Sequence, residues 1–188
     1  MAGFELIDDE ERHAVDAVMR STVLFAHGFD GMRNGVFKVR EFEQEFAAKM
    51  GSPWAQAVSS GTAALLVGLK ALGVGPGDEV ITQSHTFVAT VEAILAAGAS
   101  PVIAEVDDTL NLDTAALESL ITARTRAIIP VHMLGVAADM ASIMRIAERH
   151  KLAVLEDTAQ AVGASFRGRR LGTFGDAAAF SFDHGKAL

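Results

Sequence analysis

The stretch Val154-Leu155-Glu156-Asp157 is a short apolar run that ends in two carboxylates. Such a run is typical of a strand that is buried on both faces, as in a parallel sheet covered by helices. A second apolar run, Ala179-Phe180-Ser181-Phe182, leads into a loop that carries Lys186. Because parallel strands end at the same edge of a sheet, we expect Asp157 and Lys186 to lie close together there.

Lysine is an unusual residue just past a buried strand, because a buried ammonium is costly without a partner. The position is favoured where the amine has a lowered pKa or forms an imine with a carbonyl compound. An amine that faces a carboxylate at this edge therefore suggests pyridoxal 5'-phosphate (PLP), whose ring nitrogen pairs with an acid. On spacing alone, Lys186 could also be a surface lysine, and Asp157 a helix cap or one half of a structural ion pair.

Outward from this stretch, apolar runs of strand length alternate with helical ones. The predicted strands cover 54–58, 79–82, 101–106, 127–131 and 153–156, and the predicted helices cover 62–72, 86–97, 114–121 and 140–150. Residues 165–171 read as an exposed hairpin turn. This alternation predicts an α/β protein, a three-layer α/β/α sandwich with a mostly parallel sheet.

The first part of the chain lacks this alternation. Residues 8–20 are predicted as a helix with Asp8 as N-cap and Glu11 completing a capping box. Residues 21–35 read as an arm or loop, and 36–50 as an amphipathic helix that Gly51 ends. We therefore expect an N-terminal helix and arm over 1–35, followed by a domain over 36–188.

Composition excludes several classes of function. The 188 residues carry 16 Lys+Arg against 24 Asp+Glu, a net charge of −8 that argues against nucleic acid or an anionic membrane as partner. There is no cysteine, so disulfides and thiolate metal sites are excluded, and the histidines show no ligand spacing, so no metal is expected. Without a recognisable signal peptide or membrane span, the expected location is cytoplasmic.

Further candidate residues follow other predicted strands. Ser60, Gly61 and Thr62 open a helix, where free N–H groups, hydroxyls and close backbone approach suit an anion, although a simple helix cap is the alternative. Phe87 could cover a flat ring, or belong to the core. Gln160 could bond a ring oxygen or be a polar loop residue, while Ser181 could bind phosphate.

Taken in order, these motifs resemble the DegT-type sugar aminotransferases, which are fold-type-I PLP enzymes. The resemblance runs from about Val36 to the last residue and is carried by segments 39–43, 59–65, 75–81, 86–90, 130–135, 155–161 and 181–186.

The resemblance implies a role for each candidate residue. Lys186 would hold PLP as a Schiff base, and Asp157 would pair with the pyridine nitrogen. Phe87 would stack on the ring, and Gln160 would sit near the ring hydroxyl. The phosphate would be held at the helix start by Ser60, Gly61 and Thr62, together with Ser181.

The resemblance also implies a reaction: transfer of an amino group, from a donor such as glutamate, to a keto-sugar for cell-surface polysaccharide or lipopolysaccharide, by a homodimer. Lys186 argues against the related dehydratases, which carry histidine there. A PLP-dependent sugar dehydratase or epimerase, and a truncated non-catalytic module, are the alternatives. Because family members continue well beyond the lysine, we expect 36–188 to be the N-terminal portion of the PLP-binding large domain, without the small C-terminal domain.

One branch of the family is similar in its arm as well. Segments 27–34 and 181–186 resemble members that aminate an eight-carbon keto-sugar acid, a keto-octulosonate. In that case Arg33 or Arg40 would meet the substrate carboxylate, with a surface ion pair as the alternative for each.

Overall fold

The computed structural model describes residues 7–186 and divides the chain into two compact units, Met1–Ala57 and Val58–Leu188. Residues 1–6 and 187–188, which belong to the two predicted domains, lie outside the described residues. The boundary drawn at 35/36 stays a prediction. Each unit is treated by itself below.

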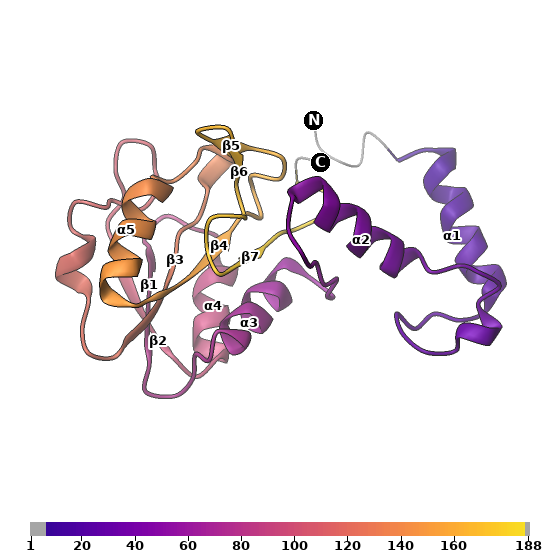
Figure 1. Cartoon of the computed structure of the whole chain (residues 1–188), viewed down its shortest axis with the longest axis horizontal. Coiled ribbons are helices and arrows are strands. Elements are labelled where there is room, and N and C mark those ends of the chain that lie inside the picture. The colour runs from indigo at the N-terminus through magenta and orange to yellow at the C-terminus, as the bar shows by residue number, and fades with distance from the viewer. Residues whose placement is uncertain (1–6, 187–188) are drawn as a thin grey trace. The chain divides into compact units, whose positions relative to one another are not determined.

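The N-terminal unit holds two helices, α1 (Asp9–Ser21) and α2 (Lys38–Met50), which Figure 1 draws in indigo and purple. The predicted capping box is confirmed, since Asp8 and Glu11 bond each other's backbone N–H groups. Gly51 ends α2 with φ +71°, a left-handed conformation that costs glycine little. Between the helices, residues 22–37 contain one 3-10 turn, η2 (Asp30–Met32), which agrees with the predicted arm.

The strand predicted over 54–58 is wrong. Among the described residues, this segment pairs with no strand, and the Trp54 side chain is 85% exposed. The Glu43 carboxylate on α2 instead accepts the backbone N–H of Ala57 and the side-chain amide of Gln56, both at 2.8 Å. The backbone is therefore satisfied by a side chain rather than by a sheet.

The C-terminal unit is built on a parallel sheet with strand order β2-β1-β3-β4-β7. Its strands are β1 (Glu79–Gln83), β2 (Ser100–Ala104), β3 (Thr125–Ile129), β4 (Ala153–Asp157) and β7 (Ala177–Ala179). A small antiparallel hairpin, β5 (Ser165–Phe166) and β6 (Arg169–Arg170), confirms the predicted turn at 165–171. β4 and β7 are neighbours, with Asp157 opposite Ala179.

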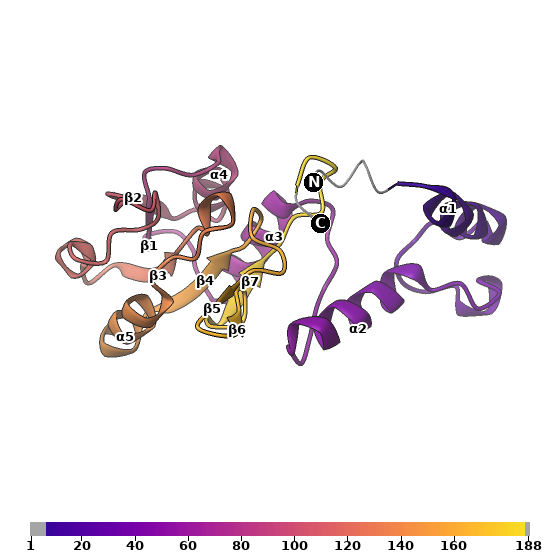
Figure 2. The ribbon, with the colours of Figure 1, turned by 90° about the horizontal axis from the view of Figure 1, so that it is seen from above.

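Helices cover both faces of this sheet, as Figure 2 shows. α3 (Gly61–Ala71) and α4 (Val88–Ala96) enclose one apolar core with alternate strand residues such as Ile129 and Leu155, and α5 (Met140–His150) encloses the other with Ile128 and Val154. The predicted three-layer α/β/α sandwich is thus confirmed. Over residues 7–186, no helix has the length and apolar character needed to cross a membrane.

The helix predicted over 114–121 is wrong in kind. The structure has only the 3-10 turn η3 (Leu117–Leu120), in which Leu117 is fully buried, and Asp113 bonds the Ala115 N–H at 2.8 Å instead of capping an α-helix. The apolar run 179–182 is also not itself the strand: β7 covers Ala177–Ala179 and shares only Ala179 with the run, because pairing with β4 stops there. This early stop leaves residues 180–186 as a loop at the edge of the sheet.

Candidate active site

The carboxyl edge of the sheet brings the two central candidates together. Asp157 is the last residue of β4, and Lys186 lies seven positions after the end of the neighbouring strand β7. The Asp157 carboxyl is buried, with 4% of the residue exposed, and the Lys186 charge acts on it. The prediction that both residues lie at one edge therefore agrees with the structure.

Asp157 is held by donors from two directions. The Thr90 hydroxyl on α4 donates to Oδ2 at 2.8 Å, and the backbone N–H of Ala159 donates to Oδ1 at 3.2 Å. Burial nevertheless raises the pKa of Asp157, against the lowering effects of these bonds and of the charge of Lys186. Such a carboxyl ionises more readily once a further cation or N–H group approaches it.

Phe87 and Lys186 meet at the same place. Phe87 precedes α4 and is 61% exposed, so its ring is not part of the core. The Lys186 ammonium lies 5.5 Å from the centroid of that ring, a cation–π distance. Lys186 is partly buried here rather than free on the surface. An exposed aromatic ring thus stands beside the amine whose charge acts on the buried Asp157 carboxyl.

An anion cradle lies at the start of α3. Ser60 caps the helix: its Oγ accepts the Ala63 N–H at 3.0 Å and its carbonyl accepts the Ala64 N–H at 2.9 Å. The first two backbone N–H groups of α3, those of Gly61 and Thr62, donate to no acceptor within residues 7–186. A Cβ on Gly61 would lie 3.0 Å from the Cβ of Ser181, so glycine lets this buried serine approach the helix end.

Gln160 lies at the border of this edge. Its Oε1 accepts the backbone N–H of Leu134 at 3.1 Å, and its Nε2 lies 3.7 Å from the sulfur of Met133. The side chain therefore ties the turn after β4 to the turn after β3. Its amide group retains donor capacity for a ligand oxygen.

A buried polar cluster behind Asp157 was not predicted. Glu156, fully buried, accepts hydrogen bonds from the His132 ring at 3.1 Å and from the backbone N–H groups of Gly172, Phe174 and Gly175. His132 Nδ1 accepts the Ala138 N–H, so the ring proton sits on Nε2 and is donated to Glu156.

This cluster keeps Glu156 ionised. Burial raises the pKa of Glu156, but the bonds from His132, Gly175 and Gly172 outweigh it, and the net pKa is lowered. The carboxylate thereby fastens the loop that enters β7, and so the strand that leads toward Lys186. The only signal in the sequence was the pair Glu156-Asp157, whose side chains must point to opposite faces of a strand.

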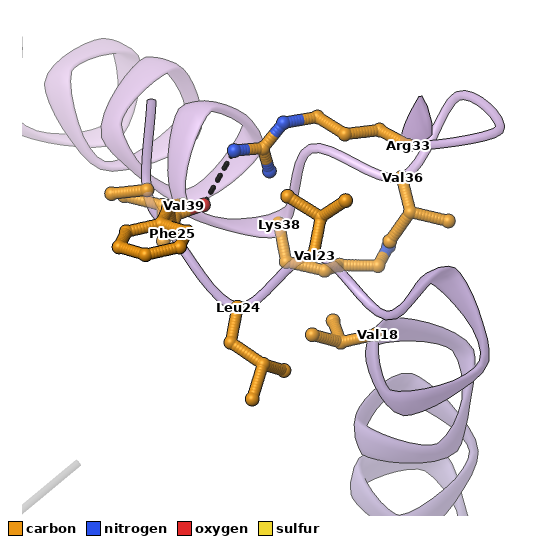
Figure 3. Close-up of a pocket in the computed structure, with 9 residues that line it drawn as sticks. Val18, Val23, Leu24, Phe25, Arg33, Val36, Lys38 and Val39 are labelled. Atoms are coloured by element: carbon orange, nitrogen blue, oxygen red, sulfur yellow. Dashed lines mark hydrogen bonds between the residues drawn. The ribbon is translucent and has the colours of Figure 1, made fainter. Parts of the chain in front are cut away.

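In the N-terminal unit, Arg33 has no free guanidinium for a substrate. It is 5% exposed, and it donates to the carbonyls of Gly28 at 2.7 Å and Phe25 at 2.5 Å. Figure 3 shows Arg33 reaching toward Phe25 across a small pocket of mostly apolar side chains. The Arg40 side chain is half exposed, and its guanidinium nitrogen lies 3.7 Å from a carboxylate oxygen of Asp30. This agrees with the surface ion pair given as its alternative role.

No cluster of three or more metal-ligating side chains occurs within residues 7–186. The site thus consists of an amine, a buried carboxylate, an aromatic face and a helix N-terminus beside a serine. This set matches the needs of a phosphorylated cofactor that carries an aldehyde and a ring nitrogen, on the α/β fold described above.

The chain belongs to the DegT/DnrJ/EryC1/StrS aminotransferase family, whose model matches residues 5–188. The resemblance inferred from the motifs is therefore confirmed.

Individual relatives agree with the family match. Spore coat polysaccharide biosynthesis protein SpsC of Bacillus subtilis is 51% identical over 146 residues, covering 77% of this chain and 38% of the relative. GDP-perosamine synthase of Caulobacter vibrioides is 49% identical over 149 residues, covering 79% and 40%. The crystal structure of NtdA from Bacillus subtilis with bound cofactor PMP superposes with a TM-score of 0.83 at 34% identity, covering 96% and 39%. The chain thus spans about two fifths of the length of these relatives.

Proposed function

We propose that the protein is a PLP-dependent aminotransferase that moves an amino group from an amino-acid donor, such as glutamate, to a keto-sugar. The observation that carries this proposal is the meeting of Lys186, Phe87 and buried Asp157 at the carboxyl edge of the sheet. Family membership supports amino transfer, and the names of the relatives support a sugar as acceptor.

The residues present fit PLP. The close approach of Gly61 to Ser181, which a Cβ would obstruct, gives a cradle in which the phosphate would be held by the N–H groups of Gly61 and Thr62, with hydroxyls from Ser60, Thr62 and Ser181 nearby. The exposed face of Phe87 would cover the ring, and the Gln160 amide would donate to the ring oxygen.

PLP, when bound, supplies a carbonyl carbon that takes up amines and a ring that delocalises negative charge. Lys186 Nζ is the group that would attach to the cofactor, and the same atom would carry a proton to and from the reacting carbon. Asp157 would hold the proton on the ring nitrogen. Burial opposes its charge, so pairing with a positively charged ring N–H would favour the ionised carboxylate.

The acceptor and the setting extend the same proposal. One relative is named as a GDP-perosamine synthase and another as a spore coat polysaccharide protein. The second name supports a role in polysaccharide biosynthesis. We propose that the acceptor is a keto-sugar destined for a cell-surface polysaccharide or lipopolysaccharide. We further propose a cytoplasmic homodimer that handles small molecules. The net charge of −8 disfavours nucleic acid as partner.

An isotope-transfer experiment tests the proposal. The complete natural polypeptide is incubated with PLP, 15N-glutamate and a nucleotide-linked keto-sugar, and the sugar is analysed by mass spectrometry. Transfer of the label is expected for the wild type and for Lys49→Ala, which removes an exposed lysine of the other unit, but not for Lys186→Ala. A sugar product formed without loss of the donor's nitrogen would contradict amino transfer.

A further inference from the structure

We propose that Thr90 is a positioning residue of this site: its hydroxyl, itself oriented by Thr86, fixes the Asp157 carboxylate in the rotamer and charge state that a ring N–H requires. The inference rests on the proposed PLP site. It assigns a role to Thr90 in α4 and to Thr86 just before α4, two residues of segment 86–90 to which the sequence analysis gave no role. It follows from the direction in which the hydrogen bonds between these side chains can run.

Thr90 lies in the first turn of α4 and is fully buried. Its hydroxyl lies 2.8 Å from Asp157 Oδ2 and 2.8 Å from the hydroxyl of Thr86. A hydroxyl has one hydrogen to donate. When Asp157 is ionised, that hydrogen goes to Oδ2, so the Thr86 hydroxyl must donate to Thr90. The two threonines then form a one-way chain of hydrogen bonds that ends on the carboxylate.

The two ends of the carboxylate are fixed separately. Thr90 holds Oδ2, while the Ala159 N–H holds Oδ1 at 3.2 Å. Donors on both oxygens resist rotation of the carboxyl group, and each oxygen keeps a lone pair for another donor. The carboxylate is therefore oriented before any ligand arrives. Such preorganisation lowers the entropic cost of pairing with a ring nitrogen.

The burial of Asp157 makes the hydrogen bond from Thr90 important for its charge state. Burial raises the pKa of Asp157, and the Thr90 bond is the largest of the effects that lower it, ahead of the Ala159 N–H and the charge of Lys186. His132 is turned toward Glu156 on the other face of β4, and its Nδ1 accepts the backbone N–H of Ala138. Within the described residues, Thr90 and the Ala159 N–H are the donors recorded in direct contact with the carboxylate.

Packing alone does not require a hydroxyl at this position. α4 has the sequence Val88-Ala89-Thr90-Val91-Glu92-Ala93-Ile94-Leu95-Ala96 and buries an apolar face against α3 and the sheet. Valine has nearly the shape of threonine and suits such a face. A buried threonine in a helix often bonds a carbonyl of its own helix, whereas Thr90 donates to Asp157, 67 positions away.

The test compares two cofactors on the apo form of the complete natural polypeptide. One is PLP, and the other is its 1-deaza analogue, in which carbon replaces the ring nitrogen. Thr90→Val is expected to weaken PLP binding on the order of tenfold, or about 1.4 kcal/mol, since one hydrogen bond to a charged group is lost. Binding of the analogue, which makes no bond to Asp157 through nitrogen, is expected to change by less than about twofold.

Matched variants separate positioning from a general loss of stability. Thr90→Ser restores the hydroxyl and is expected to bind PLP as the wild type does. Thr82→Val removes another fully buried hydroxyl, one that bonds the Ile129 carbonyl at 2.9 Å, and is expected to leave both affinities unchanged. If Thr90→Val does not fold, Thr86→Val replaces it, with a loss of about two- to threefold expected for PLP alone.

The outcomes distinguish this inference from the proposed function. Equal loss of PLP and of its analogue in Thr90→Val would overturn the positioning role, and so would unchanged affinity for both. Asp157→Asn serves as reference, because it should weaken PLP and spare the analogue. If the wild type binds no PLP, the proposed function itself fails. If Asp157→Asn discriminates between the two cofactors and Thr90→Val does not, only the role of Thr90 fails.

Discussion

Replacing Glu156 by glutamine should destabilise the protein strongly although the shape of the side chain is conserved. Each Glu156 oxygen accepts two donors: Oε1 those of Phe174 and Gly175, and Oε2 those of Gly172 and His132. A glutamine amide turns one of these acceptors into a donor in either orientation. Two buried donors then lose their partner, at about 1–3 kcal/mol each, so the free energy of unfolding should fall by about 2–6 kcal/mol.

Histidine cannot rescue this loss by moving its proton. If the His132 proton shifted to Nδ1, that nitrogen would face the N–H of Ala138, which it now accepts at 3.2 Å. Urea unfolding followed by circular dichroism measures the effect. Glu118→Gln is the matched control, because this glutamate forms exposed ion pairs with Arg149 and His150 and should matter little. Equal stability of the two variants would refute the reasoning.

Two further predictions concern the cradle and the pH dependence. Gly61→Ala should weaken PLP binding severalfold, measured by titrating the apoprotein, because the added Cβ meets the Ser181 Cβ at 3.0 Å. Gly75→Ala is the control and should spare PLP binding, because a Cβ there meets nothing within 4 Å. For Asp157, a raised pKa means that ionisation opposes folding above that pKa, so Asp157→Asn should stabilise the apoprotein at neutral pH in thermal melts. That advantage should shrink as the pH falls through the folded pKa and vanish below the model-peptide value of 3.8; an advantage that grew on acidification would have the wrong sign.

Much of the fold follows from the sequence because its local signals agree with its tertiary structure. The capping box at Asp8 and the glycine at 51 mark helix ends that the structure confirms. The apolar strands marked a sheet covered on both faces. Where the strand predicted over 54–58 failed, a side chain of another element decided: Glu43 accepts the N–H of Ala57 that a strand would have paired.

In the candidate site, too, local sequence signals do not reveal the contacts between side chains of different elements. Spacing could place Asp157 and Lys186 at one edge, since both follow parallel strands. It could not show that Thr90 bonds Asp157, because helical periodicity does not say which turn of α4 meets the end of β4. Nor could it show that His132 and Glu156 close a buried cluster, which depends on three backbone N–H groups of the loop before β7.

The account depends most on the attachment of the cofactor to one amine. The complete polypeptide is loaded with PLP, reduced with borohydride and digested, and the modified peptide is located by mass spectrometry. The account predicts one stable adduct on the Nζ of Lys186, absent from Lys186→Ala and retained in Lys49→Ala. An adduct on another lysine, or none in a folded wild type, would contradict it.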